Sequence, residues 1–366
     1  MRTKVYALLI AMLLLTAGNV WAERYYVKSS GGSDGNSGIG SWDNAFANLQ
    51  AALDVVGAGD EIWIAQGAYT PTKIIGGGTD NRDMAFLLEV DIKLYGGFVG
   101  DESTLDERVA GNTTTLSGDI ETPGLSTDNT YHVLITTNLS NAAIIDGITI
   151  SGGNANGSGF ININTYNFNR DYGGGMYHTF SSPTITNVII CDNNTSEIGG
   201  GMFNSDSSPI LTGVTISGNT AKYAGGMENA FSSSPVLTNV IVSGNAAIHN
   251  GGGVYSTASS SPILTNVTIT GNTAGGIGGG MLNDNASSPI LTNVTISGNV
   301  AGFGGGIFNT YSFPELYNCL VLGNSSGVND DNSLSTYGNC FVQELDIPIP
   351  GILGTAPNAE IGRAHV

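Results

Sequence analysis

Apolar and polar residues alternate in short runs through the second half of the chain, and the runs recur at a fixed period. Val214-Thr215-Ile216 and Val294-Thr295-Ile296 are two copies of the same run. An apolar residue at every second position is typical of a strand with one buried face. Each unit contains three such runs, one after a glycine cluster, one after a proline and one ending at Ser-Gly-Asn. No run has the 3.6-residue period of a helix.

The period is set by six prolines, with spacings of 26, 26, 27, 27 and 25 residues. A fixed period of this length indicates stacked structural repeats. Three short strands per turn predict an all-β fold, a right-handed single-stranded parallel β-helix. Each strand then pairs with its equivalent one turn away, at about 4.8 Å. The prolines are Pro183, Pro209, Pro235, Pro262, Pro289 and Pro314.

Two columns of asparagine are expected to stack in this arrangement. Asparagine tolerates a left-handed backbone and can bond the equivalent residue above and below. We expect one ladder of Asn193, Asn219, Asn245, Asn272, Asn299 and Asn324. The second column is Asn187, Gly213, Asn239, Asn266, Asn293 and Asn318. Gly213 supports a left-handed bend there, because glycine adopts it at little cost.

The front half is less regular and divides into an N-terminal cap (23–70) and irregular coils with loop insertions (71–172). Residues 41–56 have a helical apolar pattern, and a short helix there would cover the open end of the stack. Regular repeats follow at 173–329, and 330–359 is expected to end the stack. Predicted strands are 60–65, 92–95, 114–116, 133–136 and 144–150, and predicted loops are 74–82 and 154–170.

The first 22 residues predict a secretory signal peptide. Arg2 and Lys4 precede an apolar run (5–17) that is short for a membrane span, and small residues precede residue 23. We therefore expect a secreted or cell-surface protein of a bacterium. The whole chain has a formal charge of −19. This acidity disfavours nucleic acid and anionic membrane surfaces as partners.

Neither the three cysteines nor the final residues are expected to add to the fold. Cys191, Cys319 and Cys340 are an odd number in an exported chain, so no disulfide framework is implied, and a Cys319–Cys340 pair is left open. Residues 360–366 resemble the translation of a common sequencing-adapter DNA. We expect them to be foreign and the natural C-terminus to be missing.

Two short motifs resemble a known repeat type. Gly199–Met202, paired with Ile216–Asn219, is similar to the Gly-Gly-Ala-Ile and Phe-x-x-Asn pair of polymorphic outer-membrane protein repeats. The front half resembles exported bacterial proteins of the pectin-lyase-like β-helix superfamily. This resemblance implies the β-helix fold, and it implies surface adhesion or carbohydrate-active chemistry as the functions to weigh. Its stretches are 25–38, 46–69, 94–101, 114–120 and 144–154.

The repeats do not contain a recognisable set of the residues that a lyase or hydrolase would need. Between residues 173 and 329 the one Lys or Arg is Lys222, and the acidic residues share no aligned column in adjacent coils. Ca²⁺ needs several converging oxygens and a glycosidase needs a carboxylate pair. We predict no catalytic residue, no metal site and no cofactor, and Ca²⁺ is left open as a cofactor that no residue pattern supports. A charged set in the front half could still meet in space: Asp80, Arg82, Asp83, Asp101, Glu102, Asp106, Glu107, Arg108, His132 and Asp146.

One column of the repeat suggests a binding surface. It alternates with the inward methionine column and contains Glu228, which would be costly inside, so we expect it to point outward. Exposed rings in a row would form a docking face for a glycan or a protein partner. The alternative is a row of self-stacked rings shielded by neighbouring loops. The predicted exposed stripe is Tyr177, Phe203, Tyr255, Leu282 and Phe308.

The sequence thus favours an exported binding or adhesin-like scaffold over an enzyme. A polysaccharide lyase or glycoside hydrolase with its site in the front coils is the main alternative. A passive structural part of the cell envelope is the third class, because a β-helix can act as a spacer without a ligand.

Overall fold

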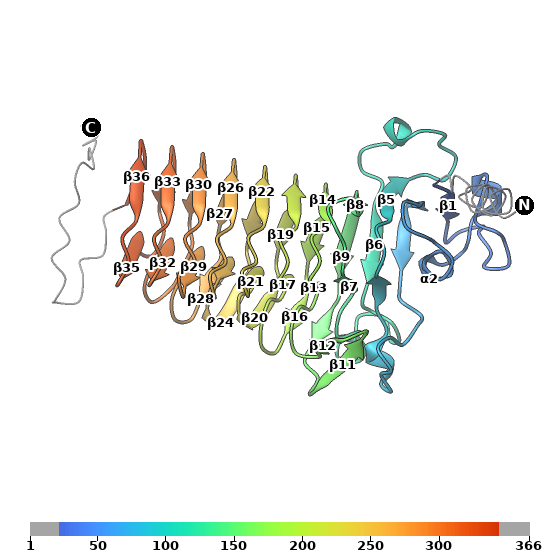
Figure 1. The fold of residues 1–366 in the computed structure, drawn as a ribbon, viewed down its shortest axis with the longest axis horizontal. Coiled ribbons are helices and arrows are strands. Elements are labelled where there is room, and N and C mark those ends of the chain that lie inside the picture. The colour runs from blue at the N-terminus through green and yellow to red at the C-terminus, as the bar shows by residue number, and fades with distance from the viewer. Residues whose placement is uncertain (1–21, 344–366) are drawn as a thin grey trace, which may run out of the picture.

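A computed structural model describes residues 22–343. They form an elongated stack of coils with the N-terminal end at one tip and the last described coil at the other (Figure 1). Three long parallel sheets run along the stack. The predicted signal peptide, apart from Ala22, lies outside the described residues, as do 344–359 of the predicted end of the stack and the segment 360–366.

The three sheets contain 11, 10 and 9 strands. The 11-stranded sheet contains β1 (Arg24–Val27), β2 (Glu61–Ala65), β5 (Lys93–Phe98), β8 (Ile144–Asp146), β14 (Thr184–Thr186), β18 (Ile210–Thr212), β22 (Val236–Thr238), β26 (Ile263–Thr265), β30 (Ile290–Thr292), β33 (Glu315–Tyr317) and β36 (Thr336–Gly338). The 10-stranded sheet contains β3 (Gly67–Tyr69), β6 (Thr114–Ser117), β9 (Ile148–Ser151), β15 (Ile189–Cys191), β19 (Thr215–Ser217), β23 (Ile241–Ser243), β27 (Thr268–Thr270), β31 (Thr295–Ser297), β34 (Leu320–Leu322) and β37 (Phe341–Val342). The 9-stranded sheet contains β4 (Phe86–Leu88), β7 (Leu134–Thr137), β13 (Met176–Thr179), β17 (Met202–Ser205), β21 (Met227–Ala230), β25 (Val254–Ser256), β29 (Met281–Asp284), β32 (Ile307–Thr310) and β35 (Val328–Asp331).

Several elements lie outside these sheets. A fourth short strand in some coils builds a 5-stranded sheet that the sequence did not predict: β10 (Asn154–Ala155), β16 (Asn194–Thr195), β20 (Thr220–Tyr223), β24 (Ala246–Asn250) and β28 (Thr273–Ala274). An antiparallel hairpin is formed by β11 (Phe160–Ile163) and β12 (Tyr166–Asn169). The short helices are η1 (Trp42–Asn44), α2 (Leu49–Leu53), η2 (Asn81–Asp83), η3 (Leu105–Glu107) and η4 (Ser126–Asp128).

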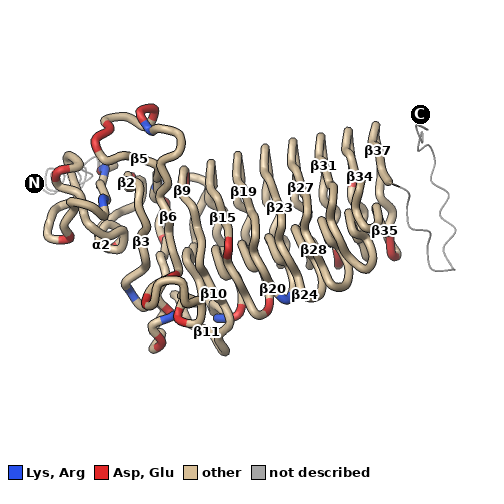
Figure 2. Tube along the Cα trace, turned by 180° about the vertical axis from the view of Figure 1, so that it is seen from behind, with Lys and Arg blue, Asp and Glu red and all other residues tan. Residues whose placement is uncertain are grey.

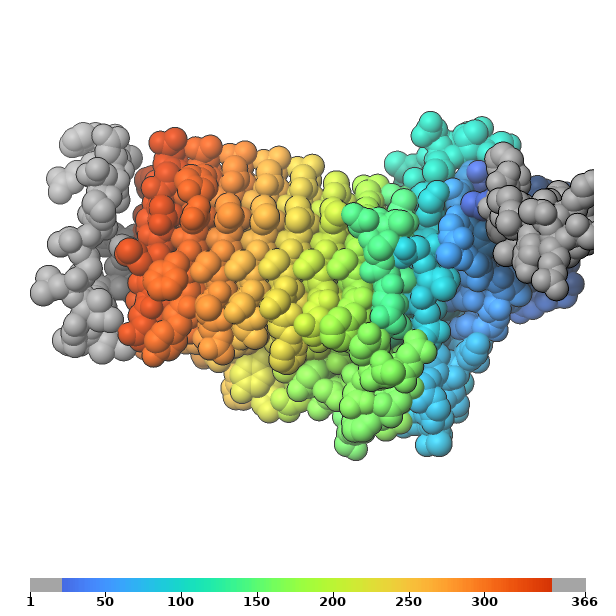
Figure 3. Space-filling view, viewed as in Figure 1, coloured from blue at the N-terminus to red at the C-terminus, as the bar shows by residue number. Residues whose placement is uncertain are grey.

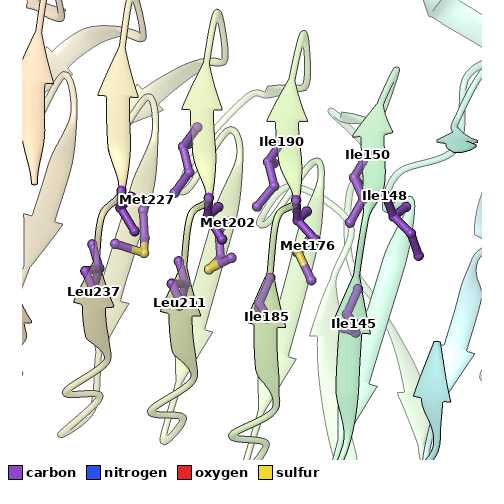
Figure 4. Close-up of a cluster of buried hydrophobic side chains, with 14 of the residues drawn as sticks. Ile145, Ile148, Ile150, Met176, Ile185, Ile190, Met202, Leu211, Met227 and Leu237 are labelled. Atoms are coloured by element: carbon purple, nitrogen blue, oxygen red, sulfur yellow. The ribbon is translucent and has the colours of Figure 1, made fainter. Parts of the chain in front are cut away.

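The strands pair in the register that the repeat predicts, so equal positions lie next to each other in adjacent coils. Leu211 pairs with Leu237, and Leu237 with Leu264. All three side chains are fully buried. Their column and the methionine column face each other inside the coil and form one continuous core (Figure 4). The right-handed parallel β-helix with three main strands per coil is therefore confirmed.

The predicted asparagine ladder is also present. Its members are buried, and each one from Asn219 onward accepts two hydrogen bonds from the asparagine of the preceding coil. The first member, Asn193, accepts from the backbone N–H of Gly153 instead. Asn245 Oδ1 accepts from the backbone N–H and the side-chain amide of Asn219, both at 3.0 Å. Its own Nδ2 donates to Asn272 Oδ1 at 2.9 Å and to the carbonyl of Ile216 at 2.9 Å. These bonds satisfy polar groups that would otherwise be orphaned in the core.

The second asparagine column turns the chain between the 11-stranded and 10-stranded sheets. Asn187, Gly213 and Asn239 have φ values of 52°, 63° and 55°, which places this corner in the left-handed region. Asparagine and glycine are the residues that reach this region most cheaply. The side chains of this column are largely exposed, and the hydrogen bonds between them, such as those from Asn266 to Asn239 at 3.3 Å and from Asn293 to Asn266 at 3.2 Å, are open to water. The column therefore acts mainly through its backbone conformation.

The glycine clusters lie at a different corner, where the neighbouring coil leaves no room for a side chain. A Cβ on Gly226 would lie 2.4 Å from the carbonyl oxygen of Gly253, and one on Gly253 would lie 2.5 Å from that of Gly280. Backbones of adjacent coils approach too closely there for any side chain. The first position of a cluster tolerates Ala224 because its constraint is a positive φ of 57° rather than contact with the next coil.

Two predictions for the front half need correction. The helix predicted over 41–56 is broken into η1 and the five-residue α2, whose Leu49 and Ala52 cover the core at the N-terminal end. The loop predicted over 154–170 contains the β11–β12 hairpin. Its strand β11 alternates exposed and buried side chains, a period-two pattern that the sequence analysis missed.

We predict that Asn245→Ala destabilises the fold by about 3 kcal/mol, because it deletes four side-chain hydrogen bonds and leaves a buried amide of Asn219 unpaired. The measurement is the midpoint of urea unfolding of the mature chain.

The matched control is Asn266→Gly in the exposed corner column, where glycine already occurs at Gly213. We expect its midpoint to change by less than about 1 kcal/mol. Equal losses in the two variants would contradict the distinction between a buried ladder and a backbone corner.

Candidate functional site

The predicted exposed stripe is largely buried, so this expectation was wrong. Tyr177, Phe203 and Leu282 are only 4%, 3% and 1% exposed, and Tyr255 and Phe308 are half-buried. The outward direction was right, because Tyr177 and Phe203 pack in a cluster separate from the core inside the coil. Tyr177, Phe203 and Leu282 therefore present almost no surface to solvent.

A second layer of chain covers the stripe. Phe168, from the β11–β12 hairpin, packs edge-on against Tyr177 at 4.9 Å, and Tyr172 packs in the same way against Phe203 at 5.3 Å. Tyr177 and Phe203 also contact each other at 5.0 Å. The hairpin projects from the side of the stack in Figure 1. For Tyr177 and Phe203, the alternative of self-stacked rings shielded by neighbouring segments is therefore the correct one.

Glu228 occupies this covered stripe between Phe203 and Tyr255. It is 4% exposed, and its Oε2 has no hydrogen-bond partner within the described residues. Burial disfavours the ionised carboxylate and raises the pKa of Glu228 to about 8. The carboxyl group thus holds its proton at neutral pH and is too enclosed to reach a substrate.

Exposed aromatic rings occur instead at the next corner, between the 9-stranded and 11-stranded sheets. Phe180, Phe231 and Tyr311 are 49%, 57% and 60% exposed. We call these three residues the corner aromatics. They are equivalent positions of different coils, one residue beyond the ends of β13, β21 and β32. Figure 3 shows how side chains of successive coils align in rows along the stack.

The corner aromatics are held in an unfavourable backbone conformation. Their φ values are 48°, 54° and 48°. Bulky residues rarely adopt this left-handed region, and doing so costs about 1 kcal/mol or more. Every residue of the column shares the conformation, and most of the others are small or polar: Asn138, Asp206, Ala258, Asn285 and Asn332.

Two neighbours define the surroundings of Phe180. Tyr166, from the hairpin, stacks on its ring at 4.9 Å, and the Tyr166 hydroxyl donates a hydrogen bond to Asn138 at 3.1 Å. Tyr166 therefore lies on the Asn138 side of Phe180. On the other side, one coil further along, comes the exposed Asp206. Its carboxylate has no hydrogen bond or ion pair within residues 22–343.

The charged residues of the front half do not meet at one place. They form two groups on the loops of the front coils, whereas the regular coils carry few charges (Figure 2). In the first group, Arg170 binds both carboxylate oxygens of the buried Asp83 at 2.7 Å. Arg82 lies over the Tyr131 ring at 4.2 Å, and the Tyr131 hydroxyl donates to Asp80 at 2.8 Å.

The first group is built to hold loops in place. The backbone N–H of Arg82 is the main cause of the lowered pKa of Asp80. The Arg82 side chain donates to the carbonyls of Asn129 and Asn154 at 2.6 and 2.7 Å. An open polar hollow of about 670 Å³ beside it is lined by Thr79, Asp80, Asn81, Arg82, Glu121, Thr127 and Asp128.

The second group surrounds Arg108 in a hollow of about 610 Å³ beside η3. Arg108 Nη1 donates to Asp146 at 2.5 Å, and Asn187 donates to the other Asp146 oxygen at 3.3 Å. Both oxygens of this carboxylate are therefore occupied. Asp106 also lines the hollow and is exposed. Hydrolysis of a glycoside needs two available carboxyl groups, and this hollow presents one.

The remaining candidates of the front half have structural positions. The Glu102 carboxylate accepts from the backbone N–H groups of Val99 and Gly100 at 2.5 and 2.9 Å, and Glu107 caps the start of η3. Burial lowers the pKa of His132 to about 4 and that of His178 to about 3. Both imidazoles are therefore neutral within the fold. Asp101 lies exposed in the loop before η3.

The described chain shows neither a metal-binding cluster nor a membrane-spanning helix. Residues 22–343 contain no group of three or more His, Cys, Asp or Glu placed to hold a metal ion. No helix in the same range is long and apolar enough to cross a membrane. Cys319 and Cys340 lie in adjacent coils, and the Cys319 amide lies 3.3 Å from the Cys340 sulfur, but both thiols are free.

The solved structures similar to this chain share little sequence identity with it. Pectate lyase Pel9A is 15% identical with a TM-score of 0.49, over 88% of this chain and 80% of its own. A rhamnogalacturonan lyase is 13% identical with a TM-score of 0.34, over 76% and 82%. PfbA, a surface adhesin of Streptococcus pneumoniae, is 12% identical with a TM-score of 0.28, over 80% and 86%.

No protein-family model matches the chain, and no curated protein is similar to it in sequence. The identities and TM-scores of the solved structures are too low to carry a function over to this chain. The fold itself follows from the parallel pairing of its strands, coil upon coil.

We predict that the stability of the protein falls between about pH 4.5 and 8 through Glu228. Its pKa is about 8 in the fold against an ordinary value of 4.5, so the folded state holds a proton that the unfolded state has released. This contribution is full below pH 4.5, declines as the pH rises to 8, and changes no further above that. The measurement is the melting temperature against pH.

Glu228→Gln keeps the shape of the neutral acid and removes the titration. We expect the variant to exceed the native chain in stability by a margin that grows from pH 4.5 to 8 and then stays constant. If the difference in stability between the variant and the native chain stayed constant from pH 4.5 to 8, Glu228 would be ionised within the fold.

Proposed function

We propose that this protein is an exported, surface-associated scaffold that binds glycans through the corner aromatics. Its repeats are of the polymorphic outer-membrane protein type, and its leader directs it out of a bacterial cell. The observation that carries the proposal is that three exposed rings occupy left-handed positions where asparagine would cost less. Backbone strain at an exposed aromatic residue does not stabilise the fold. That the strain is kept there supports a role of these rings in binding.

The spacing of the rings favours a glycan as the ligand. Adjacent coils are about 4.8 Å apart, so Phe180 and Phe231 are about 10 Å apart and Phe231 and Tyr311 about 14 Å. One coil is close to the length of one pyranose unit along an extended chain. Aromatic faces stack on the apolar faces of sugar rings, and polar groups between them bond hydroxyls.

A protein partner is less well supported by this corner. Interfaces between proteins need a contiguous buried core, with anchors packed in pockets. The residues that separate the corner aromatics are Asp206, Ala258 and Asn285, which form no continuous apolar surface. A row of isolated rings with polar gaps suits a repeating polymer better.

We predict that replacing all three corner aromatics with asparagine weakens glycan binding about a hundredfold, since each ring contributes about 1 kcal/mol. The unfolding free energy should stay the same or rise by up to about 1 kcal/mol per site, because asparagine fits the left-handed corner. The measurement is retention of the mature chain on chitin, chitosan, cellulose, xylan and polygalacturonate. The proposal includes no cofactor, so EDTA should leave retention unchanged.

Ala258→Asn is the matched control, because it makes the same kind of change in the same column without removing a ring. It should bind as the native chain does. Unchanged retention of the folded triple variant would reject the corner as the binding site. Failure of the native chain to bind any of these glycans would favour a passive structural role in the cell envelope.

The alternative function is a carbohydrate-active enzyme acting at the front coils. One observation favours this location: two hollows of the described chain lie there, and one contains Arg108. Against it, Asp146 is fully engaged and the second carboxyl group that a hydrolase needs is missing from that hollow.

We predict that the purified chain releases no unsaturated or reducing ends from acidic or neutral polysaccharides, with or without Ca²⁺. Product formation that is abolished by Arg108→Ala but kept in the triple asparagine variant would make the enzyme the correct function and place its site in the front coils. The Arg108→Ala variant must first be shown to remain folded, because Arg108 also holds the loop around η3.

A further inference from the structure

We propose that Phe180, Asp206 and Phe231 form a site for an organic ammonium group, and that the glycan bound by this protein carries free amines. The ligand class is thus a glycan of glucosamine type. This inference rests on the proposed function and specifies its ligand. We call the three residues the ammonium site.

The three residues are direct neighbours on three consecutive coils. The amide of Phe180 donates to the carbonyl of Ser205 at 3.1 Å, which continues the β13–β17 register and sets Phe180 beside Asp206. The amide of Asp206 donates to the carbonyl of Ala230 at 3.4 Å, which sets Asp206 beside Phe231. All three have φ between 48° and 54°, so the backbone turns in the same left-handed region at each of them.

This order places a carboxylate between two rings at a distance that suits a cation. Two coils separate the rings by about 10 Å, so a group midway between them lies about 5 Å from each. A cation is attracted to an aromatic face within about 6 Å of the ring centre. Asp206 belongs to the coil between the two rings, so its negative charge adds to the attraction.

The surroundings keep this charge unbalanced. Lys222 is the one Lys or Arg between residues 171 and 343, and its ammonium group is bound by Glu197 at 2.8 and 2.9 Å. Asp206 has no partner among the described residues, yet it is exposed and flanked by two exposed rings. An unpaired carboxylate here attracts an amine and repels a uronic acid, so acidic pectic glycans are disfavoured.

The Phe180 ring of the ammonium site is held in place by a neighbouring side chain. Tyr166 stacks on Phe180 from the Asn138 side and is itself tied to Asn138 by a hydrogen bond, so the Phe180 ring is supported on one face and free on the other. A supported ring loses little freedom when a ligand binds.

The test compares chitosan oligomers with chitin oligomers of the same length, which differ in whether the amine is free or acetylated. Binding to the mature chain is measured by calorimetry at physiological ionic strength and at a pH where the sugar amine is protonated. We expect chitosan to bind about tenfold more tightly than chitin. Asp206→Asn should remove this preference and leave chitin binding unchanged. Phe180→Asn with Phe231→Asn should weaken both.

Asp192→Asn is the matched control, because Asp192 is also exposed, with a φ of 54°, but lies at another corner without flanking rings. It should bind as the native chain does. Equal losses in the Asp206 and Asp192 variants would reduce the effect to attraction of a polycation by an acidic protein and overturn the site.

Other outcomes separate this inference from the proposed function. Equal affinity for chitin and chitosan, with both lost in the ring variants, would keep the glycan-binding corner and overturn the ammonium site. Tighter binding of a lysine homopolymer than of chitosan, dependent on Asp206, would overturn the amino-sugar ligand in favour of a basic protein segment. Native affinity for chitosan in the ring variants would also overturn the site.

Discussion

Hydrogen bonding between equal positions of adjacent coils is the constraint on which this structure depends. Each strand uses its backbone groups on the coils before and after it, so the conformation at any position is set by its neighbours in the column. Burial and hydrogen bonding are therefore properties of a whole column of equivalent residues rather than of a single residue. Leu211 is buried because Leu237 and Leu264 are, and Asn245 is satisfied because Asn219 and Asn272 take the same pose.

The same constraint explains how strained aromatic residues persist at a corner. Asn138, Asn285 and Asn332 define a left-handed turn that the coil needs, and the hydrogen bonds of the column impose this turn on Phe180, Phe231 and Tyr311 as well. The buried asparagine ladder holds each coil so firmly that about 1 kcal/mol of local strain does not change its path. The rings are therefore presented on a rigid frame, which lowers the entropy lost on binding.

Periodic features could be predicted from the sequence, and features without a period could not. The core columns and the ladder through Asn245 follow from a pattern that every coil repeats. The burial of Tyr177 does not, because alternation shows only that a side chain leaves the coil, and Phe168 and Tyr172 cover it from segments outside the repeat. The corner aromatics had a signal, since Phe180 and Tyr311 each precede a corner proline by three residues, but their left-handed backbone is visible only in three dimensions.

The distribution of charge separates the structural from the functional parts of the chain. In the front coils, Asp83 and Asp146 are engaged by Arg170 and Arg108, so most of the charge that suggests chemistry in the sequence serves to anchor loops. The buried Glu228 is protonated at neutral pH and closed off from solvent. Asp206 differs from all of these, because it combines exposure, an unpaired carboxylate and two neighbouring rings. The Asp206 carboxylate forms no bond within the described fold, and its backbone is held rigidly. A ligand of opposite charge can therefore gain the most binding energy at this residue.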